Sequence, residues 1–376
     1  MSHTLGLYAM KVAHLTSVHF RYDTRIFLKE CRSLVSFGHS VHLIVADGKG
    51  DEVKDGINIH DVGLLSGRLN RMLKTTHKVY LFALTLDADV YHLHDPELLP
   101  VGLRLKRKGK TVIFDAHEDL PKQLMGKSYL NLISKLILSK SFGLFERLVC
   151  GRFDAIVAAT PSIGEKFKKI NKITVTVNNF PMLGELSGGE INWAKKKNEV
   201  SYIGGITSIR GIAQVVDAMA QVESDVCLQL GGRFAEKDVE AAVKQGKGWV
   251  RVEPLGFIGR KEVRDALERS VAGLVTFLPS PNHIDAQPNK MFEYMSAGIP
   301  VIASDFPLWR EIIEGNQCGL CVDPLNSNEI ARAIDFLVCN PIQAEIMGQN
   351  GQRAVQERYN WSIEEKVLAS LYSQLA

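Results

Sequence analysis

Short apolar segments alternate with amphipathic segments almost from the start of the chain. The β-branched segment 41–45, VHLIV, for example, follows a segment, 25–37, whose apolar residues recur at helical spacing. Strands that alternate with helices in this way form parallel sheets that helices cover. The pattern therefore predicts an α/β protein. The strands expected in the first half are residues 11–16, 41–45, 57–62, 90–94, 111–114, 154–158 and 173–177.

A second series of the same kind follows a segment that has no clear period. Residues 181–198 are rich in Gly, Lys and Asn, which is typical of a linker. From residue 327 onward the chain reads as helix, with breaks near Pro341 and Asn360. The order predicts two Rossmann-like domains, 1–180 and 199–360, and a separate final helix, 361–376. The strands expected in the second half are residues 200–203, 226–230, 249–252, 271–277, 300–303 and 319–322.

The segment 279–305, PSPNHIDAQPNKMFEYMSAGIPVIASD, carries the most specific pattern. It predicts a polar loop after a strand, then a helix that Gly298 ends, then another strand. Loops at the carboxyl ends of parallel strands bind ligands, and helix N-termini favour anions. Asp285 and Glu293 are separated by seven residues, and Lys290 lies between them. We expect this loop and helix to form a binding site.

A glycine turn follows the first strand of the second series. In SYIGGITSIRG, Gly204 and Gly205 let the backbone approach a ligand closely, and Arg210 could hold a diphosphate. The alternative is that Arg210 is a surface residue near a helix cap. No GxGxxG follows the first strand of either half, which argues against a dinucleotide-dependent oxidoreductase.

Polar residues also follow strands of the first half. Asp23 and Arg25 come after the first strand, where they are candidates for the acceptor side or the diphosphate side of a site, although Asp23 is equally well interpreted as a helix N-cap. Two further strands end in His92-Leu-His94-Asp95-Pro96 and in Asp115-Ala-His117-Glu118-Asp119. These residue types could form a metal site.

Composition excludes several classes of protein. The chain is 45% hydrophobic and 23% charged, as in ordinary soluble proteins, and its six cysteines show no disulfide framework. We expect no signal peptide and no membrane-spanning segment. The net charge of +3 is uneven, because residues 1–180 contain 26 Lys and Arg against 17 Asp and Glu, whereas the remainder contains 19 against 25. The first half is therefore the part suited to an anionic partner.

A basic amphipathic segment, 121–152, lies within this first half. Leu, Ile and Phe recur in it at helical spacing between basic residues, and no acid occurs between Asp119 and Glu146. Such a segment suits an anionic membrane surface. Helices packed on the first sheet with a solvated lysine edge explain it equally well. The basic residues are Lys122, Lys127, Lys135, Lys140, Arg147 and Arg152.

Residues 285–304 resemble the signature of the family 4 glycosyltransferases, which are retaining enzymes of the GT-B fold. The family pattern is an acidic residue, seven residues, a Glu on a helix, a small-residue turn and an apolar Pro-Val strand, and it appears here as Asp285, AQPNKMF, Glu293, YMSAG and IPVIAS. The resemblance extends over nearly the whole chain and is most specific in residues 199–323. It implies two Rossmann-like domains that face each other across a cleft.

The resemblance assigns roles to residues of the second half. Glu293 corresponds to the Glu that binds the ribose of the sugar nucleotide, and Asp285 stands where the family has a Glu that meets the donor sugar. Gly205 replaces an Arg that the family often carries, and Arg210 occupies the family's Lys-Gly position. Lys290 is then expected to supply the missing cation for the diphosphate.

In the first half the resemblance gives the strand ends other roles than metal binding. His117 matches the histidine that points at the donor sugar, and the turn at His94-Asp95-Pro96 is mainly structural. Asp23 and Arg25 resemble a subgroup with Asp-x-Arg at this place. The family usually works without an essential metal, so no metal or other cofactor is expected.

The implied activity is transfer of a sugar, with retention, from a nucleotide-diphosphate sugar to an acceptor hydroxyl in polysaccharide or glycolipid assembly. The expected partners are the nucleotide sugar, a glycan or lipid-linked acceptor, and the anionic inner face of a membrane, for a cytoplasmic or peripheral protein. A GT-B sugar-nucleotide epimerase and a non-catalytic sugar-nucleotide or lipid-binding module are the alternatives. Nucleic-acid binding is not expected, because the basic half lacks the interleaved aromatic residues of single-strand platforms.

Overall fold

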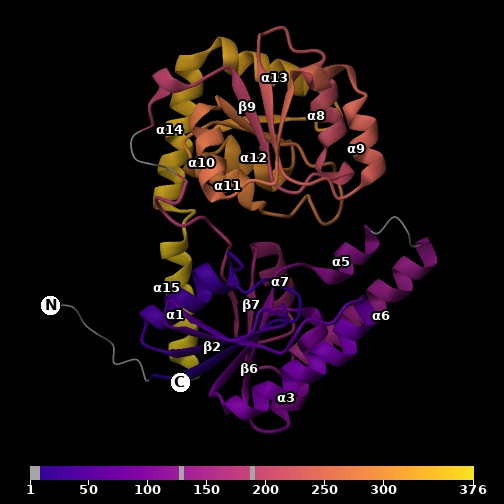
Figure 1. Cartoon of the computed structure of the whole chain (residues 1–376), viewed down its shortest axis with the longest axis vertical. Coiled ribbons are helices and arrows are strands. Elements are labelled where there is room, and N and C mark those ends of the chain that lie inside the picture. Colours follow the sequence, from indigo (N-terminus) through magenta and orange to yellow (C-terminus); the bar gives the residue numbers. More distant parts are fainter. Residues whose placement is uncertain (1–8, 127–130, 187–190) are drawn as a thin grey trace, which may run out of the picture. The chain divides into compact units, whose positions relative to one another are not determined.

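The computed structural model describes residues 9–126, 131–186 and 191–376, which divide into two compact units. Unit 1 contains the chain up to Asn179 together with Trp361–Ala376, and unit 2 contains Phe180–Asn360 (Figure 1). The boundary between the units thus lies after residue 179, one residue before the expected end of the first domain at residue 180. Of the predicted linker, residues 187–190 lie outside the described residues. Each unit has its own sheet and its own core.

Unit 1 is built on a sheet of eight strands among the described residues, in the order β3-β4-β2-β1-β5-β6-β7-β8. All neighbouring strands are parallel except β3 and β4. The order changes direction between β1 and β5, so the loops that follow these two strands lie next to each other. The strands are β1 (Lys11–Leu15), β2 (Ser40–Val45), β3 (Glu52–Lys54), β4 (Ile57–Asp61), β5 (Val90–Leu93), β6 (Thr111–Ala116), β7 (Ala155–Ala158) and β8 (Thr174–Thr176).

The helices of unit 1 include the final segment of the chain. That segment, α15, joins unit 1 because the indole Nε1 of Trp361 donates to Ser33 Oγ at 2.9 Å and Glu364 accepts the Asn178 backbone N–H at 2.7 Å. A π-helical turn, Ile26–Cys31, precedes α1. The helices are α1 (Arg32–Ser36), α2 (Arg68–Asn70), α3 (Thr76–Leu86), α4 (Leu99–Lys106), α5 (Leu120–Met125), α6 (Leu132–Cys150), α7 (Pro161–Lys168) and α15 (Trp361–Leu375).

Unit 2 contains a parallel sheet of six strands among the described residues, in the order β11-β10-β9-β12-β13-β14. Counted within the unit this is the order 3-2-1-4-5-6 of a dinucleotide-type fold, and its switch point lies between β9 and β12. Ligands of such sheets bind outside the carboxyl ends of the strands at that point. The strands are β9 (Glu199–Ile203), β10 (Cys227–Gly231), β11 (Val252–Gly256), β12 (Ala272–Val275), β13 (Val301–Ser304) and β14 (Gly319–Val322).

Alternate residues of these strands enter two apolar clusters, one on each face of the unit 2 sheet. Tyr202 and Leu274 belong to the cluster that α8 and α13 complete, whereas Ile203 and Val275 belong to the cluster of α10, α11 and α12 (Figure 1). Burial on both faces explains why the strands are almost continuously apolar. The helices are α8 (Ile212–Met219), α9 (Lys237–Lys244), α10 (Arg260–Arg269), α11 (Asn289–Ser296), α12 (Pro307–Ile313), α13 (Ser327–Cys339) and α14 (Pro341–Glu357).

The predicted α/β alternation is confirmed, with corrections in three places. Residues 249–252 were expected to be a strand, but a 3₁₀ turn, Lys247–Arg251, stands there and β11 starts at Val252. A Cβ on Gly248 would lie 1.8 Å from the Val216 carbonyl oxygen, so this turn packs directly on α8. The expected helix 25–37 is a π-helical turn followed by the short α1, and the hairpin strand β3 was not predicted.

The helix predicted after the polar loop is confirmed as α11. Its Met291 and Met295 are fully buried, and Gly298 follows the helix end with a positive φ of 65° that favours glycine. The cysteines are all free thiols, of which Cys339 is exposed. Among the described residues no helix is both long enough and apolar enough to cross a bilayer.

Candidate functional site

The loops that follow β9 and β12 meet at the switch point of unit 2. The two strands are neighbours, since Ala272 pairs with Val200 and Gly273 with Ser201. Gly204 and Gly205 come directly after β9 and are exposed. The loop after β12 leads into α11, whose first residues include Lys290. The structure therefore brings the glycine turn, Arg210 and the polar loop of the sequence pattern together at one edge of the sheet.

Arg210 is held over the glycine turn. Its Nη1 donates to the Gly205 carbonyl oxygen at 3.1 Å, and a Cβ on residue 205 would lie 2.6 Å from that nitrogen. The residue after Arg210 must be a glycine, because Gly211 has a φ of 76° and its Cβ would stand 2.0 Å from the Thr276 carbonyl oxygen. Because residue 205 has no side chain, the Arg210 guanidinium has room to lie against the glycine turn.

Lys290 is the most unusual residue of the site. Its side chain is only 8% exposed, and its Nζ makes no hydrogen bond with any of the described residues. The ammonium lies 3.6 Å from the centre of the Tyr202 ring and 5.1 Å from that of Phe277, and the Arg210 guanidinium is 5.3 Å from the same Phe277 ring. Lys290 and Arg210 therefore both contact the Phe277 ring, and little negative charge surrounds Lys290.

Burial lowers the pKa of Lys290 well below its usual range, Arg210 lowers it further, and Glu293 opposes the shift. A buried ammonium without a hydrogen-bond partner is costly, and ring contacts offset only part of that cost. Since α11 also directs the N–H groups of its first turn toward its N-terminus, an anion placed there would meet two cations and a helix dipole. The electrostatics of this site suit a phosphate-bearing ligand.

The two carboxylates of the sequence motif lie in different surroundings. Asp285 is half-buried in the loop before α11, and this loop is fixed where Trp309 Nε1 donates to the Ala286 carbonyl oxygen at 2.7 Å. Glu293 Oε1 accepts from Arg260 Nη1 at 2.7 Å, and Arg260 also pairs with Glu185 at 2.6 Å. Sequence reasoning missed Arg260, and its position at the start of α10 carries no motif that could have indicated it.

In unit 1 the structure supports the interpretation of Asp23 as a cap. Its carboxylate accepts the backbone N–H groups of Arg25 and Ile26 at 2.8 and 3.0 Å, and its other oxygen lies 3.3 Å from His19 Nδ1. Burial opposes ionisation, but the hydrogen bonds from His19 and from these backbone groups hold the pKa of Asp23 below its usual value. Asp23 therefore begins the π-helical turn while remaining partly exposed.

Arg25 does not present its side chain to a ligand, which corrects its assignment as a candidate for the acceptor side. It is 4% exposed and donates to both oxygens of Asp115 at 2.8 Å, to the Val177 carbonyl oxygen at 2.8 Å, and lies 3.0 Å from Glu30. Burial alone would lower its pKa, but Asp115 and Glu30 raise it. The guanidinium is part of the core of unit 1.

His117 stands at the outer end of the same cluster. Its Nε2 lies 2.8 Å from Asp115 Oδ2 and 3.3 Å from His94 Nδ1, and its side chain is 19% exposed. Asp95, in contrast, accepts the Thr16 hydroxyl and the Ser17 backbone N–H at 2.9 and 2.6 Å, so it ties the β1 loop to the end of β5. The ring of His117 is therefore partly exposed to solvent, and it lies next to the buried carboxylate of Asp115.

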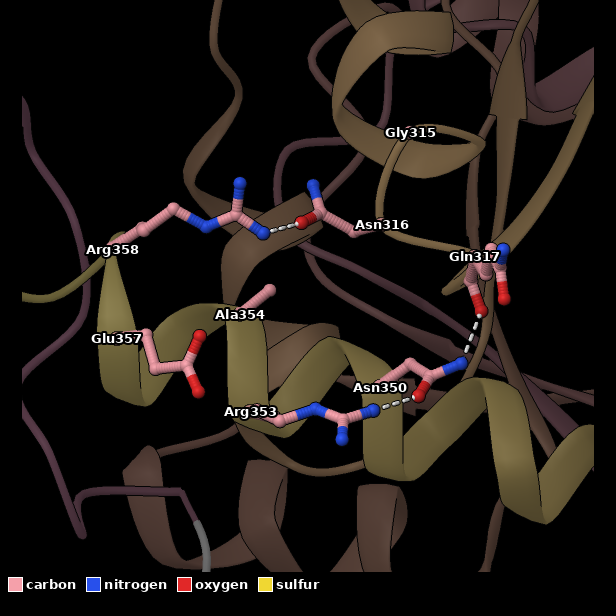
Figure 2. A pocket seen from close by; sticks show the side chains of 8 residues that line it. All are labelled: Gly315, Asn316, Gln317, Asn350, Arg353, Ala354, Glu357 and Arg358. Carbon is pink, nitrogen blue, oxygen red and sulfur yellow. Dashed lines mark hydrogen bonds between the residues drawn. The ribbon is translucent and has the colours of Figure 1, made fainter.

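A polar hollow elsewhere in unit 2 contains no predicted site residue. Figure 2 shows it between the turn before β14 and helix α14, where Arg358 bonds to the Asn316 side-chain oxygen and Arg353 to that of Asn350. Glu357 adds a carboxylate to the same wall. Because the guanidinium groups already have acceptors, this hollow lacks the uncompensated charge found at Lys290.

Both halves of the chain match known families. Residues 188–354 match the family described as Glycosyl transferases group 1, and residues 5–178 match the one described as Glycosyltransferase Family 4. A phosphatidyl-myo-inositol mannosyltransferase of Mycobacterium leprae is 28% identical over 171 residues, 44% of each chain. An alpha-D-kanosaminyltransferase of Streptomyces kanamyceticus is 24% identical over 188 residues, 47% of this chain and 45% of that protein. The chain thus matches less than half the length of either relative.

Solved structures share the fold over almost the full chain. A sucrose-phosphate synthase from Thermosynechococcus elongatus has a TM-score of 0.79 at 18% identity and covers 97% of this chain and 98% of its own. The Anabaena protein HepE, solved in complex with UDP, has a TM-score of 0.73 at 15% identity and covers 97% of this chain and 100% of its own. The fold is GT-B, as the sequence resemblance implied.

Proposed function

This chain belongs to the group 1, family 4 glycosyltransferases, and on that premise we propose that it transfers a sugar from a nucleotide-diphosphate sugar to an acceptor hydroxyl with retention of configuration. One observation carries the proposal. The buried Lys290 ammonium has no hydrogen-bond partner in the described part of the chain and stands near Arg210 at the start of α11, at the switch point of unit 2. A diphosphate supplies the negative charge that this group lacks.

In this proposal the donor binds to unit 2 through four side chains. Lys290 and Arg210 neutralise the diphosphate together with the N-terminus of α11. Glu293 accepts hydrogen bonds from the ribose hydroxyls, and Arg260 fixes the direction of its carboxylate. Asp285 contacts the donor sugar from the loop that Trp309 anchors. Gly204 and Gly205 admit the ligand to the backbone of the β9 loop.

The transfer itself requires no enzyme nucleophile. The bond between the sugar C1 and the leaving phosphate oxygen breaks, and the acceptor oxygen forms a bond to C1 on the same face. The acceptor proton passes to the leaving phosphate oxygen. Negative charge grows on the diphosphate as the bond breaks, so Lys290 and Arg210 stabilise the transition state more than the ground state. His117 orients the sugar through its ring, which Asp115 holds at 2.8 Å.

A ligand screen tests the nucleotide part of this proposal. Thermal shifts with UDP, GDP and their sugars identify the base, because a ligand that binds the folded state raises its stability. UDP is the first choice, since HepE was solved with it. We expect one nucleotide class to raise the melting temperature of the wild type and to lose that effect in Lys290→Met. If none of the nucleotides shifts the wild type, the proposal fails.

Product analysis separates the alternative functions. A glycosyltransferase releases nucleoside diphosphate in step with acceptor glycosylation, an epimerase changes the donor sugar without acceptor, and a non-catalytic module binds donor without turnover. The double variant Arg210→Gln, Lys290→Met should lose far more turnover than binding, because the charge grows in the transition state. A double variant with near-wild-type kcat would mean that other groups carry this charge.

We also propose that unit 1 rests on an anionic membrane surface, where a lipid-linked acceptor would be found. Helix α6 supports this proposal, because none of its side chains from Leu132 to Phe145 is buried. Lys140 and Arg147 are exposed beside this apolar surface, and Lys135 is half-exposed. The apolar residues that are exposed by between 37% and 70% are Leu132, Ile133, Leu136, Ile137, Leu138, Leu144, Phe145 and Leu148.

The contacts of α6 favour a membrane over packed helices with a solvated lysine edge. A helix packed on the sheet would bury its apolar stripe, yet the buried residues of α6 are Glu146, Val149 and Cys150 at its C-terminal end. Apolar side chains flanked by lysines suit insertion at the headgroup level of an anionic leaflet. Lys127, one of the basic residues of the sequence pattern, lies outside the described residues.

Vesicle co-sedimentation tests this membrane proposal. Ile137→Ser with Leu144→Ser should abolish sedimentation with anionic vesicles, and Lys135→Gln with Lys140→Gln should weaken it at low salt, by about 1 kcal/mol per lysine. Ile342→Ser is the matched control, since Ile342 is 76% exposed on α14 in unit 2. Equal sedimentation of all these proteins, or the same sedimentation with neutral vesicles, contradicts the proposal and favours a soluble acceptor.

A further inference from the structure

A closed cluster of histidines and one carboxylate lies inside unit 1, away from solvent. His14 stands on β1 opposite His92 on β5, in register, and His94 follows two residues later, directly after the end of β5. Glu30 enters from the π-helical turn Ile26–Cys31. The side chains of His14, His92 and Glu30 are fully buried, and His94 is 1% exposed. These four residues are called the His14 cluster.

The distances within the His14 cluster leave a gap of the size of an ion. Glu30 Oε2 lies 4.0 Å from His14 Nδ1, 4.0 Å from His92 Nδ1 and 4.0 Å from His94 Nε2. This separation is too long for hydrogen bonds. Four ligands around a tetrahedral zinc ion, with bonds of about 2.0–2.1 Å, stand about 3.3 Å apart. Each ligand atom would therefore have to move by less than about 1 Å to bind zinc.

The polar atoms of the His14 cluster are incompletely paired. Among the described residues, His14 Nε2, His92 Nε2 and Glu30 Oε2 have no hydrogen-bond partner, and Glu30 Oε1 has the 3.0 Å ion-pair contact with Arg25 Nε. The pairing that exists is a contact of 2.8 Å between His14 Nδ1 and His94 Nε2, and one of 2.9 Å between His92 Nδ1 and the Tyr372 hydroxyl. Buried polar groups without partners are rare in native proteins. The 4.0 Å distances join Glu30 Oε2 to Nδ1 of His14 and His92, so an ion there would supply a partner for Oε2 and not for the two Nε2 atoms.

The two buried carboxyl groups of this region, Asp115 and Glu30, are unequally paired with Arg25. Arg25 contacts both carboxylates: it donates a bidentate pair of hydrogen bonds to Asp115, whereas its contact with Glu30 is a single one of 3.0 Å from Nε. One guanidinium thus faces two fully buried carboxylates, Asp115 and Glu30. Burial and Asp115 raise the pKa of Glu30 well above its usual value, and a divalent cation among the imidazoles would favour the ionised form of this carboxyl group.

We propose that the His14 cluster is a structural zinc site with His14, His92, His94 and Glu30 as its four ligands. Two histidines at i and i+2 on one strand and a third in register on the neighbouring strand converge on one point, and three imidazoles with one carboxylate suit Zn²⁺. Four protein ligands leave no open position, so the ion joins β1, β5 and the π-helical turn and takes no part in the transfer.

The surroundings of His94 support this assignment. Its second ring nitrogen, Nδ1, lies 3.3 Å from Asp115 Oδ2, which is the arrangement in which a carboxylate holds the outer N–H of a metal-bound imidazole. The ion replaces the shared His14–His94 hydrogen bond and the Tyr372 contact of His92. Because His94 is also adjacent to His117, the site connects the core of unit 1 to a predicted residue whose ring reaches solvent.

Metal analysis of the full chain, purified without a histidine tag and refolded with and without zinc, tests the proposal. We expect about one zinc per chain after dialysis, a higher melting temperature for the zinc-refolded protein, and loss of the bound zinc in Glu30→Gln and in His92→Gln. His42→Gln is the matched control, because His42 and His60 form a similar pair at 3.0 Å on β2 and β4 with no buried carboxylate beside it. This variant should keep its zinc.

Two further measurements keep the test decisive. His117→Gln should also retain the zinc, which excludes the neighbouring group of His94, Asp115 and His117 as the site. Cobalt-substituted wild type should show the visible absorption of tetrahedral cobalt, a result that needs no variant to fold. Wild type that holds no zinc after refolding with it, or zinc that survives in both Glu30→Gln and His92→Gln, overturns the proposal.

Discussion

Two groups of charged side chains, one in each unit, differ in how their charge is compensated. In unit 1 the Arg25 guanidinium is enclosed and bonded to both oxygens of Asp115, to a backbone carbonyl and to Glu30. In unit 2 the Lys290 ammonium is equally enclosed, but it contacts aromatic rings and makes no hydrogen bond. Both residues are cations within motifs that follow a strand, and the sequence alone did not distinguish them.

The difference separates a structural role from a binding role. Arg25 is paired inside the protein, so its removal leaves Asp115 buried without its cation. Lys290 has no such partner, so its removal relieves the folded protein of a desolvated amine. What Lys290 lacks is an anion, and an anion that is absent from the fold has to come from a ligand. The two residues should therefore respond to substitution in opposite ways.

We expect the largest change in stability when the ion pair between Arg25 and Asp115 in unit 1 is removed. Arg25→Met should lower the free energy of unfolding by about 3–5 kcal/mol, because a buried carboxylate loses its partner. Denaturant unfolding measures this change. Arg310→Met is the control, since Arg310 pairs with Asp305 on the surface of unit 2 and should cost less than about 1 kcal/mol. Equal losses for the two variants would mean that the Arg25 cluster is not structural.

Substitution of Lys290 should spare stability and remove activity. Lys290→Met should lower turnover by about 100- to 1,000-fold, the range seen when one group that stabilises transition-state charge is lost. The control is Lys196→Met, because Lys196 is a half-buried lysine of unit 2 whose Nζ does have an acceptor, the Leu267 carbonyl oxygen at 2.9 Å. That variant should lose stability and keep turnover. The reverse outcome would refute the distinction between paired and unpaired cations.

Substitution of Glu293 tests whether this carboxylate binds the donor nucleotide sugar. Glu293→Ala should weaken nucleotide-sugar binding by about 1–3 kcal/mol, as is usual when a charged hydrogen-bonding partner is removed, and leave the fold intact. Glu185→Ala tests the same ion-pair network from its other end, because Arg260 bridges the two carboxylates. It should bind donor normally. Nucleotide affinity that is unchanged in a folded Glu293→Ala protein would remove Glu293 from the site.

The smallest effect is a dependence of stability on pH. Burial depresses the pKa of Lys290 in the folded protein, whereas the unfolded chain titrates near its ordinary value of about 10.5. Between these two values the unfolded state binds more protons, so stability rises with pH. Wild type should therefore gain stability relative to Lys290→Met as the pH increases from neutral to about 10.5. Parallel pH profiles of the two proteins would show that Lys290 is not desolvated.

The sequence was sufficient to predict the α/β alternation and helix α11, because apolar periodicity and the glycine stop at residue 298 are local signals. It did not reveal the hairpin of β3, although Asp55 and Gly56, both with positive φ, form the Asp-Gly turn typical of such hairpins. It also grouped Arg25 with the ligand-facing residues. Whether a strand-end cation is paired depends on Asp115, 90 residues away, and such distant contacts leave no pattern in the sequence.

The most direct test of the account is calorimetric titration of the nucleoside diphosphate identified by the screen into three proteins: wild type, Lys290→Met and Lys196→Met. We expect Lys290→Met to bind at least about tenfold more weakly, a loss of about 1.4 kcal/mol, and Lys196→Met to bind like the wild type. If Lys290→Met binds the diphosphate as tightly as the wild type, the buried ammonium is not its partner and the central claim is wrong.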